Sequence, residues 1–268
     1  MRFLAIAVCL LFATSSSEAK PRKSQQSKRD RGKRVRPVDV AVHDDAPPTR
    51  RRRAPGDRDS RRAPGLESKP QSFGVPWNGH LRNPVQLRLG DGAHIRRPYR
   101  AFGTRTTVEF TKRAIEETLE LHPKAHVLAV GDLSAQFGGP VSDHASHQSG
   151  RDVDLGLFYK RKPAGYPNAF LDGNETNLDT PAMWTLINKL TNTANKNGGV
   201  WAIFLDYDVQ GVIYRWAKRH GVRQNKLDRV FQYPHGRYAG HGIVRHYRNH
   251  AHHLHVRFKC TKAETSCR

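Results

Sequence analysis

The sequence predicts an α+β fold with a mainly antiparallel sheet and flanking helices. Three stretches show the apolar spacing of amphipathic helices, and several short apolar stretches are typical of buried strands. These stretches follow one another in mixed order, whereas strict alternation would indicate a parallel sheet. Helices are expected at about 106–121, 180–197 and 209–220, and strands at 126–130, 154–158, 200–205 and 254–258.

Residues that favour helix ends bound these helices. Thr106 and Glu109 form a capping-box pattern at the start of the first helix, and Pro123 follows its end. Pro181 suits the first turn of the second helix. Gly221 suits the left-handed position that follows the third helix.

The chain is expected to hold one folded domain, residues 71–268, behind two N-terminal segments. Residues 1–19 are typical of an export signal, because a short positive start precedes an apolar run that is too short to span a bilayer. A membrane anchor and a lipoprotein at Cys9 are less favoured alternatives. Residues 20–70 combine Arg and Lys clusters with Pro and have little apolar surface to bury, so we expect a disordered basic linker.

The net charge of +22 bears on partners and location. The basic linker could contact anionic wall polymers or lipids by charge alone, or it could be a solvated spacer without a partner. No specific nucleic acid is expected, because the basic run lacks interleaved aromatic residues and the export signal conflicts with it. Export predicts a periplasmic or secreted protein, and the oligomeric state stays open.

Two cysteines remain once Cys9 leaves with the signal. Cys260 and Cys267 could form one disulfide that closes a small C-terminal loop in an oxidising compartment. Two free thiols are the alternative. The pair does not predict a zinc finger, because no second Cys or His pair lies beside it at finger spacing.

Two histidine-rich segments carry residue types that suit a metal site. The first, 143–154, holds His147 and, after six intervening residues, Asp154 at the start of an apolar strand. A chain that leaves a loop at His147 and enters a strand at Asp154 could bring both to one ion. Two imidazoles and one carboxylate are a donor set of catalytic Zn²⁺, which keeps a further position for water.

The second segment, 250–258, supplies the other imidazoles. Strand alternation points His253 and His255 to the same face, so one could bind metal while the other faces the substrate. His250 and His252 have the same spacing, which leaves a second frame open. The remaining histidines outside the two segments are interpreted as ordinary surface or core residues.

These two segments resemble the signatures of the penicillin-insensitive murein endopeptidases. Residues 146–155 and 253–258 match the pattern of a His, six residues, an Asp and a later His-x-His. The resemblance spans about 73–260 and implies the hedgehog/DD-peptidase-like fold of a group that also includes lysostaphin and D-alanyl-D-alanine metallopeptidases. Residues 251–252 depart from the family pattern, which puts the fine substrate preference in doubt.

The resemblance also implies roles for single residues. His147, Asp154 and His255 would ligate Zn²⁺. His253 would be the unligated imidazole that acts as a base or stabilises the charged intermediate, and His250 would be an additional site histidine at its side.

Four more residues match the signature around the site. His144 would lie at the rim or behind the ligands, and Asp152 would hydrogen-bond a ligand histidine. Arg151 and Arg257 would meet a carboxylate of the substrate, with a structural ion pair as the alternative reading.

The function implied is a zinc endopeptidase that cuts the D-alanyl–meso-diaminopimelyl cross-link of peptidoglycan and is insensitive to β-lactams. A carboxypeptidase or dipeptidase that releases D-Ala is a neighbouring alternative. A wall-binding protein with a structural zinc site is an alternative from another class.

Overall fold

The computed structural model describes residues 71–268. The predicted signal at 1–19, the predicted basic linker at 20–70 and Cys9 lie outside the described residues. No helix of the described domain is long and apolar enough to cross a bilayer.

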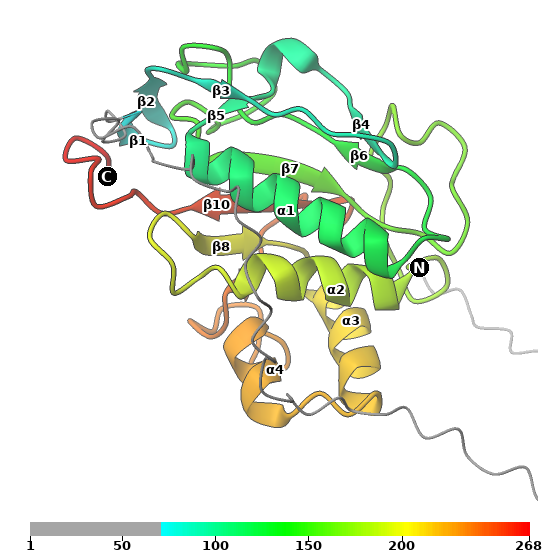
Figure 1. Ribbon diagram of the computed structural model, residues 1–268. Helices are drawn as coiled ribbons and strands as arrows, with labels where there is room; N and C mark the ends of the chain where they lie inside the picture. The colour runs from blue at the N-terminus through cyan, green and yellow to red at the C-terminus, as the bar shows by residue number, and fades with distance from the viewer. Residues whose placement is uncertain (1–70) are drawn as a thin grey trace, which may run out of the picture. The chain divides into compact units, whose positions relative to one another are not determined.

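A six-stranded sheet forms the centre of the domain (Figure 1), in the order β4-β6-β7-β10-β8-β9. The three ladders in the middle are antiparallel, and the two outer ladders, β4–β6 and β8–β9, are parallel. The prediction of an α+β fold with a mainly antiparallel sheet is therefore confirmed. The strands are β4 (Ala93–Ile95), β6 (Leu128–Val130), β7 (Asp152–Gly156), β8 (Val200–Phe204), β9 (Val244–Arg245) and β10 (His253–Phe258).

Two small ribbons and four helices complete the described domain. The ribbons pair β1 (Ser72–Val75) with β2 (Asn78–Leu81), and β3 (Val85–Gln86) with β5 (Phe102–Gly103). The helices are α1 (Arg105–Leu121), α2 (Thr180–Thr191), α3 (Tyr207–Arg219) and α4 (Gln224–Val230), and a short 3-10 turn covers Pro98–Arg100.

Two helix ends differ from those predicted by the local sequence pattern. The N-cap of α1 is Thr104, whose side chain accepts a hydrogen bond from the Thr107 N–H, so the capping box predicted at Thr106 is wrong by two residues. The predicted end of the second helix near residue 197 is also wrong, since α2 ends at Thr191. The reason is a Thr- and Asn-rich stretch whose side chains bond the backbone: the Thr193 hydroxyl accepts from the Val200 N–H at 3.0 Å.

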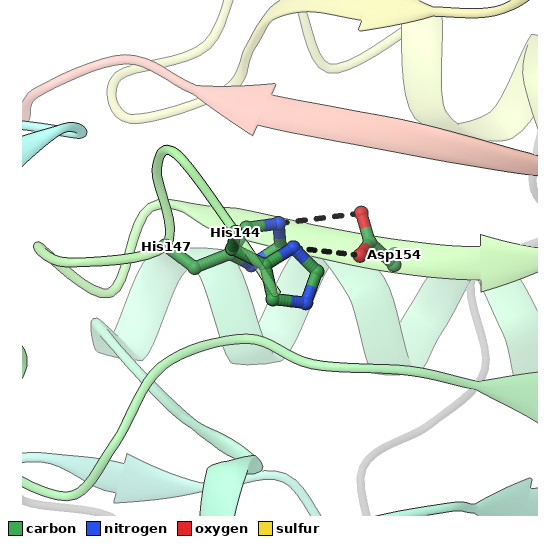
Figure 2. A group of neighbouring side chains, drawn as sticks. All are labelled: His144, His147 and Asp154. Atoms are coloured by element: carbon green, nitrogen blue, oxygen red, sulfur yellow. Dashed lines mark ion pairs between the residues drawn. The ribbon is translucent and has the colours of Figure 1, made fainter. Parts of the chain in front are cut away.

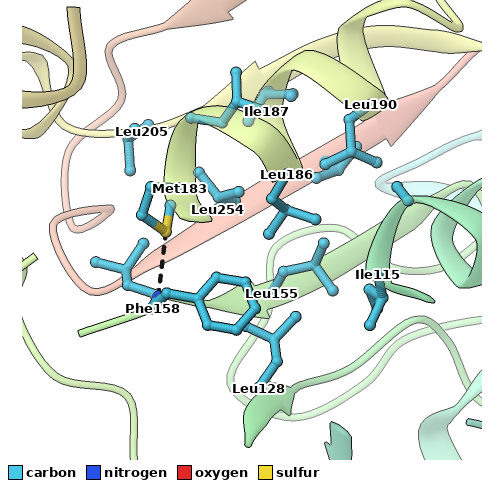
Figure 3. Close-up of a cluster of buried hydrophobic side chains, with 14 of the residues drawn as sticks. Ile115, Leu128, Leu155, Phe158, Met183, Leu186, Ile187, Leu190, Leu205 and Leu254 are labelled. Atoms are coloured by element: carbon cyan, nitrogen blue, oxygen red, sulfur yellow. Dashed lines mark hydrogen bonds between the residues drawn. The ribbon is translucent and has the colours of Figure 1, made fainter. Parts of the chain in front are cut away.

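The core lies between one face of the sheet and the helices α1 and α2, which lie side by side across it in Figure 1. Figure 3 shows Leu155 and Leu254, from the two central strands, packed against Met183 and Leu186 of α2. Each of these side chains is fully buried. Burial of a Leu or Met side chain stabilises a fold by about 1.5 to 3 kcal/mol, so this layer fixes the position of β7 against β10.

The opposite face of the same two strands carries polar side chains. Along β10, Leu254, Val256 and Phe258 belong to the core cluster, and the alternate positions His253, His255 and Arg257 therefore point away from it. One strand thus contributes both to the core and to a polar site.

The C-terminal segment closes with a disulfide between Cys260 and Cys267. This confirms the predicted pairing and excludes the free-thiol alternative. The loop lies against the first ribbon, because Gly74 N–H donates to Ser266 O at 2.9 Å and Ser72 N–H donates to the Glu264 carboxylate at 3.0 Å.

Candidate metal centre

The register of β7 against β10 brings the two histidine-rich segments together. His255 lies directly opposite Asp154, and Arg257 lies directly opposite Asp152. Directly opposite residues of an antiparallel pair share a face of the sheet, so both pairs point to the polar side. A slip of one residue would turn His255 into the core, and the buried Leu254 and Val256 on either side of it prevent such a slip.

Three donor atoms meet at this point in a nearly equilateral triangle, which we call the ligand triangle. Its corners are His147 Nε2, Asp154 Oδ1 and His255 Nδ1, and its sides are 3.3 Å, 3.2 Å and 3.3 Å. A tetrahedral zinc site with bonds of about 2.0 to 2.1 Å has edges of about 3.3 to 3.4 Å. The ligand triangle therefore has the size of one face of such a tetrahedron, and the fourth position is free for another ligand.

His147 reaches the triangle from the loop before β7 with a backbone φ of 67°. This left-handed conformation is uncommon for residues other than glycine. Its N–H donates to Asp152 Oδ2 at 3.1 Å, which holds the backbone in place. The Nδ1–H donates to the Leu133 carbonyl at 2.8 Å, so Nε2 is left with its lone pair toward the triangle.

His255 is oriented by the same carboxylate. Its Nε2 lies 3.4 Å from Asp152 Oδ1, which favours the tautomer with the proton on Nε2 and leaves Nδ1 free to bind metal. The Asp152 carboxylate also accepts hydrogen bonds from Nε and Nη2 of Arg257 at 2.7 Å and 3.0 Å. Burial disfavours the Asp152 charge, but the charges and hydrogen bonds of His255 and Arg257 outweigh it and hold the Asp152 pKa well below its usual range. Asp152 therefore contacts His255, and its role behind a ligand histidine stays a prediction.

The environment of Asp154 Oδ1 suits the binding of a cation. The atom is buried and has no hydrogen-bond partner among the described residues. Although burial disfavours the charge of this carboxylate, the neighbouring imidazoles of His147 and His255 hold the Asp154 pKa well below its ordinary value. A buried carboxylate oxygen without a hydrogen bond is costly unless a cation meets it, so the donor set suits a divalent metal.

Two other overlapping groups have ligand atoms within 4.8 Å: His144 with His147 and Asp154, and His147 with Asp152 and His255. Neither group suits a metal ion as well as the ligand triangle does. The Asp152 carboxylate is already held by Arg257 in a bidentate pair. His144 bonds another carboxylate, and its Nδ1 lies 3.8 Å from Asp154 Oδ2, which exceeds a tetrahedral edge.

His253 lies beside the triangle, with Nε2 3.6 Å from Asp154 Oδ1. Its ring stacks on Phe170 at a centroid distance of 5.2 Å, and burial lowers its pKa to about 3. Gly131 makes room for this packing, since a Cβ there would lie 2.9 Å from the Phe170 ring and 3.0 Å from Asp154 Cβ. The His250 ring follows at 4.7 Å from the His253 ring.

His144 is positioned by a residue that sequence reasoning did not single out. Asp132 is fully buried, and its carboxylate accepts from Arg97 Nε at 2.8 Å, from Arg100 Nη1 at 3.0 Å and from His144 Nε2 at 3.0 Å. Figure 2 shows His144 and His147 side by side, both turned toward Asp154 on β7. The sequence signals for Asp132 were its position in a turn directly after a buried strand and the family likeness of residues 131–134.

The site opens into a groove of about 700 Å³, which we call the first groove. Basic side chains rim it, among them Arg96, Arg97 and Arg248, and Phe204 and Tyr247 add aromatic surface. Arg151 does not line the first groove. Its guanidinium contacts Ser72 and the carbonyl oxygens of Phe258 and Arg268, which ties β7 to the C-terminal segment.

Comparison with known proteins agrees with this geometry. Residues 91–197, which include His144, His147 and Asp154, match the model of the penicillin-insensitive murein endopeptidase family. The chain is related to this family. The resemblance predicted from the two histidine-rich segments is thereby confirmed.

Curated proteins named penicillin-insensitive murein endopeptidase extend the match. One from Yersinia pestis is 28% identical over 216 residues, which cover 75% of this chain and 70% of the relative. One from Yersinia pseudotuberculosis is 29% identical over 221 residues, with the same shares of the two chains. The similarity to the penicillin-insensitive murein endopeptidases therefore extends beyond the segment that the family model matches.

Proposed function

We propose that this chain is a zinc-dependent endopeptidase that hydrolyses peptide cross-links of peptidoglycan. The ligand triangle supports the proposal most directly, because its sides match a tetrahedral zinc site and its Asp154 corner is a buried oxygen without a hydrogen bond. His147, Asp154 and His255 are the proposed ligands. Similarity to the murein endopeptidases supports the reaction class.

Zinc held there would supply an electrophile for the scissile carbonyl and would activate water for attack. The neutral His253 imidazole faces the same space, so it can accept a proton from the attacking water and deliver it to the leaving amine. Stacking on Phe170 keeps its ring plane fixed. The His250 ring, at 4.7 Å from the His253 ring, also limits its rotation.

The first groove supports an acidic peptide as substrate. Arg96, Arg97 and Arg248 line it and can pair with the carboxylates of wall peptides. The bond proposed is D-alanyl–meso-diaminopimelyl, as in the Gram-negative wall. A protein that acts on this substrate works outside the cytoplasm, as the export signal predicted at 1–19 also implies. The proposed reaction has no acyl-enzyme step, so we expect β-lactams not to inhibit it.

Digestion of purified peptidoglycan, followed by mass identification of the fragments, tests the proposal. We expect cross-linked dimers to disappear, the activity to be lost with a chelator and to return with Zn²⁺. His147→Ala should abolish cleavage, whereas His94→Ala, at an exposed position outside the groove, should not. Release of free D-Ala without loss of dimers would instead identify a carboxypeptidase, and chelator-resistant cleavage would contradict a metal mechanism.

A further inference from the structure

A second groove lies next to the first and is not explained by peptide hydrolysis. Its volume is about 320 Å³, and it shares Trp77 and Arg257 with the first groove. Its remaining lining residues are Pro76, Arg151, Trp201, Phe258, Lys259, Cys260 and Arg268. The two grooves are therefore adjacent, with Trp77 and Arg257 in the lining of both.

Two indole rings stand open to solvent in this second groove. Trp77, in the turn of the first ribbon, is 59% exposed, and Trp201, on β8, is 48% exposed. Both indoles thus present apolar surface to the solvent, and exposed apolar surface gathered in one groove is a mark of binding sites. Arg257 lies over the Trp77 ring at 5.8 Å, and Arg245 lies over the Trp201 ring at 5.5 Å. These contacts restrain both rings.

The charge of the groove narrows the choice of occupant. Among the described residues that line it, none has a carboxylate side chain, whereas Arg257, Lys259 and Arg268 are basic. A basic segment is thus disfavoured, and this includes the Arg-rich residues 20–70 of the chain itself. A neutral polymer that carries acidic branches fits better.

We propose that the second groove binds the glycan strand of peptidoglycan, with sugar rings stacked on Trp77 and Trp201. This inference rests on the proposed function, because it assigns the glycan part of the same substrate. Wall peptides offer methyl groups, carboxylates and amines, none with enough flat apolar area to cover an indole. A pyranose ring presents a flat C–H face of suitable size, and its acidic stem peptide would pass Arg257 into the first groove.

Binding of peptide-free glycan strands tests the groove without any cleavage. Tryptophan fluorescence or calorimetry should show binding to the wild-type protein, and Trp77→Ala and Trp201→Ala should each weaken it by about tenfold, the factor equivalent to about 1.4 kcal/mol. Trp201→Phe should retain most of the affinity, because a phenyl ring still stacks. Tyr238→Ala is the matched control, since Tyr238 is an aromatic residue 96% exposed and lines neither groove.

Cleavage of two matched substrates provides the second arm. Trp201→Ala should lose kcat/KM on cross-linked dimers that keep their disaccharides, by about tenfold, and should match the wild type on glycan-free cross-linked peptides, because Trp201 lines the second groove and not the first. Equal losses on both substrates would overturn the inference, as would absent glycan binding by the wild type. Glycan binding that vanishes as salt rises to about 0.5 M would also overturn it, because that signature belongs to charge rather than stacking.

The two proposals fail separately. If the wild-type protein binds glycan through the tryptophans but cuts neither substrate, the proposed glycan site is supported and the proposed peptidase activity is refuted. If the wild-type protein and the tryptophan variants cut both substrates equally well, the proposed peptidase activity is supported and the proposed glycan site is refuted.

Discussion

Asp152 contacts both histidines of the ligand triangle and Arg257. It accepts from the His147 N–H at 3.1 Å and lies 3.4 Å from His255 Nε2. A carboxylate at this position fixes the backbone of one proposed ligand and the tautomer of the other. Asp152 therefore preorganises the proposed metal site without being a corner of the triangle.

Replacement of this carboxylate should weaken metal binding. We expect Asp152→Asn to lower zinc affinity by about 10- to 100-fold, as is typical when a carboxylate behind a ligand histidine is lost. Competition with a chromophoric chelator would measure it. Asp143→Asn removes a carboxylate that is 73% exposed and also lines the first groove, so its zinc affinity should stay at the wild-type value. Unchanged affinity in Asp152→Asn would contradict the role assigned to Asp152.

The two histidines of β10 should be separable by metal content. His255→Ala should lose bound zinc, because it removes a corner of the triangle. His253→Ala should keep zinc and lose about 10²- to 10⁴-fold in kcat, the usual contribution of a general acid or base. Elemental analysis together with single-turnover kinetics checks both. Loss of zinc in His253→Ala would show that this imidazole is a ligand instead.

At the scale of elements, the site depends on the packing of β7 and β10 against α2. Leu155→Ala should lower the free energy of unfolding by about 2 to 5 kcal/mol, because the leucine is fully buried in the central strand β7. Leu121→Ala, at the end of α1 where the side chain is 61% exposed, should change it by less than about 0.5 kcal/mol. Denaturant unfolding measures both, and equal effects would contradict the layer described in Figure 3.

Some elements could be predicted from local sequence and others could not. α3 and β10 agree with the expected ranges to within two residues, because long apolar periodicity or a dense apolar run marks them. α4 was not predicted, since its seven residues bury only Leu227 and Val230. β9 has two residues, too few for any pattern.

Some residues of the site could likewise be predicted from the sequence, and others could not. The resemblance of residues 146–155 and 253–258 to the murein endopeptidases implied the three corners of the ligand triangle, whereas spacing alone left the choice among the histidines of 250–255 open. Asp132 and Phe170 could not be found this way. Asp132 acts on His144 and Phe170 on His253, and both contacts form only when distant segments fold together.

At the scale of the whole molecule, folding stability should depend on pH through His126. Its Nε2 accepts from the Tyr159 N–H at 2.9 Å, and its Nδ1–H donates to the Val127 carbonyl at 2.7 Å. Burial lowers its pKa below 6.5, more than the Val127 carbonyl raises it. The unfolded chain therefore takes up the proton first, and the stability that His126 contributes is present above pH 6.5 and is lost as pH falls below it.

A variant comparison isolates this contribution from the other histidines. The difference in free energy of unfolding between the wild type and His126→Asn should be largest near about pH 7.5 and should shrink toward about pH 5.5. The same comparison for the exposed His94→Asn should show a constant difference. A His126 difference that grows on acidification would show that the folded protein prefers the charged ring.

Arg257 belongs to two regions at once. Its guanidinium clamps Asp152, and its other side forms the wall where the first and second grooves meet. A substitution of Arg257 that aims to change polymer selectivity would also loosen Asp152 and, through it, the proposed metal-binding histidines. Substrate selectivity can be changed separately from the chemistry at Trp201, which lines the second groove and not the first.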